Sequence, residues 1–476
     1  MLQTLKNAWK TKELRNKILF TLFILLIYRI GTVIPVPFVE AHSFADSFSG
    51  TILDQMNILS GGSLGTATLF ALGVSPYINA SIIIQLLAVV FPKLAEITKN
   101  DKEKMNLITR ITTVVLAIVT AIGYYFLLKK GGALTNAASS ADNAAAWFYG
   151  IVIIACYVAG ASVIMWLGER INERGIGNGI SMILFANIIS SLPSFFYNLI
   201  SLVVSTYQYN KDIRVLYAIL STIFAILLLA VVVAMFVFII WVTGSERRIP
   251  IQYAKRVVGR KMYGGQSSNL PIKLNMTGVM PVIFASSIVS LVPTILALCG
   301  VTAETKNGWG TMAKILGSDG VIYPILLFVL IIAFAYFYTQ ISFDPIEVSN
   351  NIKRQGGTIP GIRQGRPTAM YIKKILNKVT LVGALFLGIV AVLPVVAGPH
   401  VLQHIVYWIL EGSIADLDKS NWLYTYYQSS IKSTASSLTG VFTFGGTSLL
   451  IIVGVVLETF RDLEAQLTMR NYKGFL

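Results

Sequence analysis

Residues 57–77 read NILSGGSLGTATLFALGVSPY, an apolar stretch that glycines and Pro76 interrupt before it runs into the apolar residues 74–91. We expect a short half-helix over about 60–70, a break between Gly73 and Pro76, and then a membrane span. Irregular backbone at membrane depth is tolerated only where it lines a cavity that protein or water fills. The stretch therefore predicts a pore or a binding site inside a membrane protein.

The composition excludes most other classes of protein. Of the 476 residues, 55% are apolar and only 13% are charged, whereas a soluble globular protein carries roughly 25% charged residues. The same arithmetic excludes a disordered chain. The two cysteines, Cys156 and Cys299, are too few for a disulfide scaffold. A polytopic membrane protein remains.

Ten apolar runs are each close to the roughly 20 residues that a helix needs to cross a bilayer. They are predicted as helices because isolated strands cannot satisfy their backbone groups in lipid. Residues 401–410 are apolar but stop at Glu411, so we expect an interfacial helix there rather than an eleventh span. The ten runs are 18–38, 74–91, 107–128, 147–168, 176–200, 215–243, 275–300, 321–343, 379–398 and 443–460.

Basic residues divide unequally between the two sides of these spans. With the N-terminus inside, the inside segments hold 29 lysines and arginines and the outside segments hold eight, while Arg29 lies in the first span. This bias follows the positive-inside rule and predicts that both termini are cytoplasmic. The net charge of +16 therefore belongs to one face of the protein.

Five predicted spans precede the loop near 201–214, and five follow it. Because five is odd, the second half must start from the opposite side of the membrane, which is the topology of an inverted repeat. We therefore expect an all-α polytopic membrane protein with ten transmembrane helices in two inverted five-helix halves. The N-terminal half covers 1–205 and the C-terminal half covers 206–476.

Two inside loops, 244–274 and 342–378, are long and carry seven basic residues each. Topology alone needs only a few charges close to a span. The surplus suggests a docking surface for an anionic partner such as a ribosome or an acidic protein. The alternation in IPIQYAKRVV (249–258) predicts a strand or a hairpin.

The predicted spans are nearly free of charge, with Arg29 and Glu458 as the exceptions. We expect Arg29 either to snorkel to the membrane surface or to pair with a backbone carbonyl at a helix interface, in a structural role. The alternative is an inverted-repeat secondary transporter, which also explains the ten spans and the broken helix. The nearly uncharged spans argue against it, because an ion-coupled carrier usually buries carboxylates at mid-membrane.

His400 and His404 lack a third metal ligand, and GIGNGIS (175–181) lacks the spacing of a dinucleotide-binding loop. We predict no enzyme, no cofactor and no metal.

Six motifs together resemble the bacterial SecY family, the channel subunit of the Sec protein translocon. The match covers nearly the whole chain in the family's order, although the outside stretch around 400–440 is longer than the family's pattern. The motifs are ALGVSPYINASIIIQLL (71–87), WLGERINERGIGNGIS (166–181), RRIPIQYAKR (247–256), LPIKLNMTGVMPVIFASSI (270–288), PGIRQGRPTA (360–369) and FGGTSLLI (444–451).

The resemblance implies a protein-conducting channel in the bacterial cytoplasmic membrane, which translocates unfolded secretory polypeptides and releases membrane segments laterally. It also implies a ring of aliphatic side chains, which blocks ions because a narrow apolar ring dewets. From spacing alone, the same side chains would be ordinary core or lipid-facing residues. The implied partners are the SecE and SecG membrane subunits, the SecA motor ATPase, the ribosome, signal peptides, unfolded secretory chains and anionic lipid.

The resemblance assigns four sets of site residues. The pore ring is Val74, Ile78, Ile180, Leu184, Ile283 and Ile451. The plug that fills the outside funnel is Ser60, Gly61, Gly62, Ser63, Leu64, Gly65 and Phe70. The lateral gate is Asn79, Gln85 and Asn275, whose modest hydrogen bonds would yield to a signal peptide. The residues that dock the motor or the ribosome are Arg247, Arg248, Arg260, Lys261 and Arg363.

Overall fold

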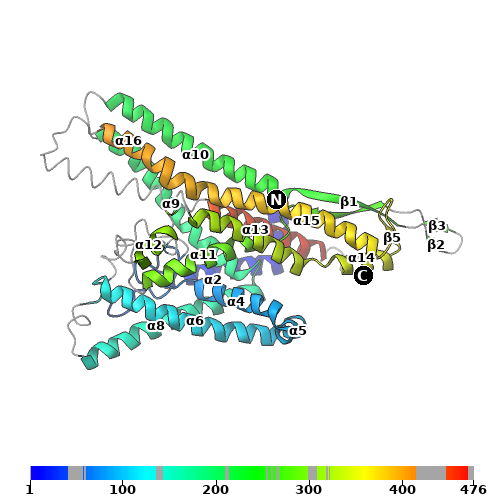
Figure 1. Ribbon diagram of the computed structural model, residues 1–476, viewed down its shortest axis with the longest axis horizontal. Coiled ribbons are helices and arrows are strands. Elements are labelled where there is room, and N and C mark those ends of the chain that lie inside the picture. Colours follow the sequence, from blue (N-terminus) through cyan, green and yellow to red (C-terminus); the bar gives the residue numbers. More distant parts are fainter. Residues whose placement is uncertain are drawn as a thin grey trace.

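The computed structural model is an elongated bundle of helices with a small group of strands at one end (Figure 1). It describes residues 2–40, 57, 60–135, 143–208, 214–253, 256–258, 261–263, 267–298, 308–317, 320, 322–413 and 446–469.

The helices follow the predicted apolar runs closely, and several short helices lie between them. They are α1 (Leu2–Lys10), α2 (Lys12–Gly31), α4 (Ser75–Val90), α5 (Pro92–Asn100), α6 (Lys102–Lys130), α8 (Asn143–Arg174), α9 (Gly179–Gln208), α10 (Arg214–Gly244), α11 (Met280–Leu298), α12 (Gly308–Ile315), α13 (Ile322–Ser342), α14 (Pro345–Arg354), α15 (Arg366–Ala397) and α16 (Gln403–Ser413). A final helix covers 446–469.

Among the described residues, six helices are long and apolar enough to cross a membrane, namely α6, α8, α9, α10, α13 and α15. Two further apolar helices, α4 and α11, are shorter. α4 ends early because Pro92 follows Phe91, and a residue before proline is pushed out of the helical region into the extended one. With α2 and helix 446–469 at the first and tenth predicted runs, the bundle is consistent with ten spans.

The helices pack in three neighbouring groups. α4, α6 and α8 lie along one side of the bundle, α10 and α16 lie along the other, and α2, α11 and α13 run between them (Figure 1). α13 packs against both α11 and α15, and α9 packs against α8 and α10. α11 also contacts α4 and α6, so it joins the first group to the middle of the bundle.

The two long basic loops form one structure that we call the β1–β5 unit. In the first loop β1 (Glu246–Tyr253) pairs antiparallel with β4 (Ser267–Lys273), and β2 (Arg256–Val258) pairs with β3 (Lys261–Tyr263). The predicted strand or hairpin is therefore confirmed. β1 also pairs with β5 (Gly357–Thr358) from the second loop, a connection that the sequence did not indicate.

An isoleucine-rich cluster holds the β1–β5 unit against α14 and α15. Alternate residues of β1 point to opposite faces of the sheet, so Ile249 and Ile251 are buried while their neighbours are exposed. Both belong to a cluster with Ile352 of α14 and Ile372 of α15. The unit therefore has a hydrophobic core of its own, separate from that of the membrane helices.

The 60–74 segment differs from the half-helix that we predicted, because it forms a series of turns. Gly61, Gly62 and Gly73 have φ angles of +70°, +88° and +56°. Glycine adopts this left-handed region without a steric penalty, and a helix cannot continue through it. A short β-bridge between Pro35 and Thr68 ties the segment to the end of α2.

α16 covers most of residues 401–410, where we expected an interfacial helix. It continues α15 through one π-turn (Gly398–Leu402) and runs along α10 (Figure 1). Pro399 lacks an N–H, and the π-turn accommodates this loss without reversing the chain. Leu402 and Val406 pack on Phe195, Leu199 and Leu228 of α9 and α10.

The segments that we predicted to lie inside gather at one end of the bundle. The final helix contacts three of the other segments: the N-terminal segment through Thr4 Oγ1 to Glu464 Oε1 (3.3 Å) and Lys17 Nζ to Gln466 Oε1 (3.0 Å), the start of α9 through Gly177 N to Asp462 Oδ2 (3.2 Å), and the end of α10 through Arg461 Nη2 to the carbonyl oxygen of Thr243 (3.4 Å). Arg110 Nε of α6 contacts Glu169 Oε1 of α8 at 2.8 Å, and β1 pairs with β5. This grouping agrees with the sidedness derived from the basic residues.

Candidate functional site

The six residues assigned to the pore ring are all buried and belong to one hydrophobic cluster. Their exposed fractions lie between 3% and 9%. Val74 caps the start of α4 and Ile78 lies one turn later, while Ile180 and Leu184 are one turn apart on α9. Ile283 comes from α11, and Ile451 comes from helix 446–469. Side chains from four helices therefore share this cluster.

The motif GIGNGIS begins α9 and so positions Ile180 and Leu184. The side chain of Asn178 accepts hydrogen bonds from the backbone N–H groups of Ile180 (3.1 Å) and Ser181 (3.4 Å), as expected of a residue at a helix N-terminus. A Cβ on Gly179 would lie 2.0 Å from the carbonyl oxygen of Gly168. Only glycine allows α9 to approach α8 this closely, so the glycines in this motif have a packing role.

Phe70 anchors the 60–74 segment in the bundle. Its side chain is 3% exposed and stacks on Tyr28 of α2, with the ring centroids 5.5 Å apart. The ring also fills the space beside Gly31, where a Cβ would lie 2.0 Å from Phe70 Cε2. Phe70 and the pore-ring residues belong to the same cluster.

Two buried tyrosines hold the backbone of the 60–74 segment. Tyr124 of α6 donates its hydroxyl hydrogen to the carbonyl oxygen of Leu64, and Tyr157 of α8 donates to that of Ala67 at 3.4 Å. Buried carbonyl groups need such partners, because an unsatisfied one costs free energy. The sequence offered only a weak signal for this role, namely that tyrosine in an apolar helix usually finds a hydrogen-bond partner.

Arg29 lies between α2, α9 and the 60–74 segment. Its Nη2 donates to the carbonyl oxygen of Ala186 at 2.7 Å, which confirms the expected pairing with a backbone carbonyl. A Cβ on Gly61 would lie 3.1 Å from Arg29 Nη1 and 2.9 Å from Asn187 Oδ1. The guanidinium therefore lies directly beside the glycine-rich turns.

Of the residues assigned to the lateral gate, Gln85 lies at the α4–α11 seam, by which we mean the contact of α4 and α6 with α11 and α13. Gln85 Nε2 donates to Ser81 Oγ at 2.9 Å, and Tyr338 of α13 donates its hydroxyl hydrogen to Gln85 Oε1. Asn275 is buried, and its Oδ1 has no hydrogen-bond partner among the described residues. Asn79 is half-buried. Sequence reasoning missed Tyr338.

The described residues assigned to docking lie on the β1–β5 unit. Arg247 and Arg248 are exposed on β1, and Arg248 Nε pairs with Glu246 Oε1 at 2.7 Å. Lys261 belongs to β3, but its side chain lies outside the described residues, as does the whole of Arg260. Burial, together with the nearby guanidinium of Arg461, lowers the pKa of Lys273, which lies where β4 returns to the bundle.

Arg363 is exposed on a turn whose backbone is firmly held. Gly361 and Gly365 have φ angles of +79° and +91° and allow the chain to reverse on each side of it. Thr368 Oγ1 donates to the carbonyl oxygen of Arg363 at 2.8 Å, and Ser349 Oγ donates to that of Gly365 at 2.8 Å. The turn therefore presents the arginine from a fixed position.

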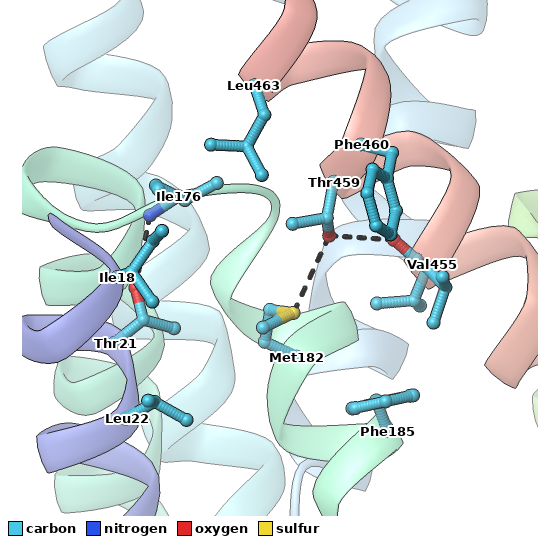
Figure 2. Close-up of a pocket in the computed structure, with 11 residues that line it drawn as sticks. Ile18, Thr21, Leu22, Ile176, Met182, Phe185, Val455, Thr459, Phe460 and Leu463 are labelled. Atoms are coloured by element: carbon cyan, nitrogen blue, oxygen red, sulfur yellow. Dashed lines mark hydrogen bonds between the residues drawn. The ribbon is translucent and has the colours of Figure 1, made fainter. Parts of the chain in front are cut away.

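A cavity of about 190 Å³ opens between α2, the start of α9 and helix 446–469 (Figure 2). Thr459 lies at its edge, where its hydroxyl donates to Val455 O at 2.7 Å and contacts Met182 Sδ at 3.7 Å. The cavity contains no charged lining residue, which makes it unsuited to a polar solute. Its lining is Ile18, Thr21, Leu22, Ile176, Met182, Phe185, Val455, Val456, Thr459, Phe460 and Leu463.

Comparison with known proteins agrees with this architecture. The SecY family model matches residues 68–416. The chain is 40% identical over 488 residues to the protein translocase subunit SecY of Streptomyces coelicolor, with all of both chains covered.

Two solved structures share the fold. The first is a SecY channel whose plug domain is described as stabilizing the closed state and maintaining a membrane seal; it is 18% identical, with a TM-score of 0.58. The second is Sec61 in the canine ribosome–channel complex, which is 16% identical with a TM-score of 0.55. In both, the match covers 95% of this chain and 92% of the other. The chain belongs to the SecY family of protein translocase subunits, and it is a protein-conducting channel rather than an enzyme.

Proposed function

We propose that unfolded secretory polypeptides cross the bacterial cytoplasmic membrane through the ring of Val74, Ile78, Ile180, Leu184, Ile283 and Ile451. The observation that carries this proposal is that six aliphatic side chains from four helices share one buried cluster with Phe70 of the 60–74 segment. Aliphatic groups have no hydrogen-bonding demand, so they can close around a polypeptide of any sequence. A narrow ring of them excludes ions by dewetting when no polypeptide is present.

Residues 60–70 of the 60–74 segment act as the plug of the resting channel. Most of its residues are small, so each buries little apolar area. The segment is held by Phe70, by a few hydrogen bonds, and by small or aliphatic residues that pack against α6 and α8, namely Leu64, Ala67, Ala71 and Leu72. The related SecY channel, whose plug domain is described as stabilizing the closed state, supports this role.

The channel opens sideways at the α4–α11 seam, which lies between an N-terminal half over 1–205 and a C-terminal half over 206–476. α4 and α6 come from the first half, and α11 and α13 come from the second. A signal peptide or a membrane segment would separate them, since its apolar core can replace the packing between the helices. The hydrogen bond between Tyr338 and Gln85 is suited to such a reversible contact.

The β1–β5 unit docks the SecA motor ATPase or the ribosome. Exposed arginines on β1 and on the turn at Arg363 provide the positive charge, and the shared core keeps the two loops in one arrangement. Sec61 in a ribosome–channel complex has a similar fold, which supports a ribosome as one partner. SecE, SecG and anionic lipid are the other proposed partners.

Electrical recording distinguishes this function from the inverted-repeat transporter. In planar bilayers, a channel that lacks 60–73 should pass large ions without selectivity, whereas the intact channel should stay closed. Saturable uptake of one solute, with no conductance after the deletion, would contradict the proposal.

A further inference from the structure

Three segments of the chain meet beside the cavity in Figure 2, at a place that we call the Gly177 junction. α2 and the turn that precedes α9 belong to the proposed N-terminal half, and the final helix belongs to the C-terminal half. The junction therefore joins the two halves at a place other than the α4–α11 seam. It consists of Lys17 and Thr21 of α2, the turn 175–178, and Asp462 and Gln466 of the final helix.

Two backbone N–H groups of the turn donate hydrogen bonds in different directions. Ile176 N donates to Thr21 Oγ1 of α2 at 3.1 Å (Figure 2). Gly177 N donates to Asp462 Oδ2 of the final helix at 3.2 Å. The first bond stays within the N-terminal half, whereas the second crosses between the halves and has a charged acceptor. Hydrogen bonds with an ionised partner are stronger than neutral ones.

The carboxylate of Asp462 is itself held in place. Gln466 lies one turn later on the same helix, and its Nε2 donates to Asp462 Oδ2 at 3.2 Å. Gln466 Oε1 accepts a hydrogen bond from Lys17 Nζ of α2 at 3.0 Å, which fixes the amide from the other side. Asp462 and Gln466 are both half-buried, so water competes only partly for these bonds.

The turn passes very close to both helices. Gly177 has a φ angle of +74°, and a Cβ on it would lie 3.0 Å from Thr459 Oγ1 of the final helix. A Cβ on Gly175 would lie 2.6 Å from Thr21 Oγ1 of α2. A movement of the final helix away from α2 would therefore pull on the turn or break its hydrogen bonds.

Both helices that the Gly177–Asp462 bond connects carry residues of the pore ring. Ile180 and Leu184 lie on the first turns of α9, directly after the turn. Ile451 lies on the final helix, which also carries Asp462. One hydrogen bond at the junction thus links ring residues that come from opposite halves.

We propose that Asp462 is a positioning residue of the pore ring. By accepting from Gly177 N, its carboxylate keeps the start of α9 against the final helix and so sets how closely Ile180 approaches Ile451. This inference rests on the proposed function. Without the carboxylate, Gly177 N loses its partner in a half-buried place, which is unfavourable. The two helices then separate more often, and the ring is wider while they are apart.

The test uses Asp462→Ala in the complete translocon, in planar bilayers with potassium chloride and no translocating substrate. The resting channel should open about tenfold more often than the parent, because a hydrogen bond to a charged group is worth roughly this factor or more. The amount of assembled translocon should equal that of the parent.

Two further variants separate positioning from a general loss of structure. Asp462→Asn keeps an oxygen that can accept from Gly177 N, so it should restore the closed resting state. Glu464→Ala is the matched control, because it removes a carboxylate from the same helix. The partner of that carboxylate is Thr4 Oγ1 at 3.3 Å, away from the turn, so this variant should stay as closed as the parent.

Gln466→Met removes the amide that holds Asp462, so the inference stays testable if Asp462→Ala accumulates poorly. It should increase openings in the same direction but less, and the double variant should add little to Asp462→Ala, because both act on one network. Openings no more frequent than in the parent, or an equal increase in Asp462→Asn or Glu464→Ala, would overturn the role of Asp462. The absence of conductance in a channel that lacks 60–73 would instead contradict the proposed function.

Discussion

Replacing Phe70 by alanine should displace the 60–74 segment and open the resting channel. The ring is 3% exposed, stacks on Tyr28 and fills the space beside Gly31, so the shorter side chain leaves a cavity. Truncating a phenylalanine in a packed core costs about 3–5 kcal/mol. If this loss falls only on the state in which the segment is seated, the displaced population rises by roughly two to four orders of magnitude.

The assay is ion conductance of the purified translocon in planar bilayers without a translocating substrate. Phe126→Ala is the control, because it removes the same atoms from a ring that is 57% exposed on α6. The control should stay as closed as the parent, while Phe70→Ala should show frequent openings. Equal conductance of Phe70→Ala and the parent would refute the idea that this ring holds the segment.

A second substitution tests the same contact from the opposite side. Gly31→Ala places a methyl group 2.0 Å from the position of Phe70 Cε2, so it should also open the channel, by overpacking. In Gly31→Ala/Phe70→Ala the new methyl group occupies space that the ring has vacated. The double variant should therefore leak less than the two single effects predict together. Strict additivity would show that the two residues act independently.

Three further predictions concern the docking surface and the seam. Arg363→Glu should lower motor-driven export by at least about tenfold, because a repulsive charge replaces an attractive one, while Lys130→Glu, on the predicted outside, should export normally. Ile251→Asp buries a charge in the core of the β1–β5 unit and should unfold it. Limited proteolysis should then cut that unit while the membrane helices stay intact. If the unit is not cut, the claim that it has a core of its own is wrong. Asn275→Leu removes a buried amide oxygen that lacks a partner among the described residues, so it should change the export of weak-signal reporters, and unchanged export would argue against a role at the seam.

Much of the fold could be predicted because membrane insertion depends on properties that are local in sequence. An apolar run of sufficient length specifies a span, and the basic residues around it specify its side. The contacts from Thr4 to Glu464 and from Arg110 to Glu169 agree with that sidedness. The pairing of Arg29 was predictable for the same reason, since a lone charge in lipid needs a polar partner.

Contacts between distant segments could not be predicted in this way. The pairing of Gln252 in β1 with Thr358 in β5 depends on two loops that are about a hundred residues apart. The hydroxyls of Tyr124, Tyr157 and Tyr338 find their partners only after the helices have packed. Likewise, the composition of 60–70 favours a half-helix, but the φ angles of its glycines depend on the helices against which this segment packs.

The most direct test is to place a photo-crosslinking residue at Ile78, Ile283 or Ile451 and to stall a secretory chain in the channel. Ile122, which is 39% exposed on α6 and lies outside the ring, provides the control position. We predict that all three buried positions crosslink to the stalled chain and that the control position does not. Crosslinks at Ile122 but none at the three buried positions would contradict the proposal that polypeptides pass through this ring.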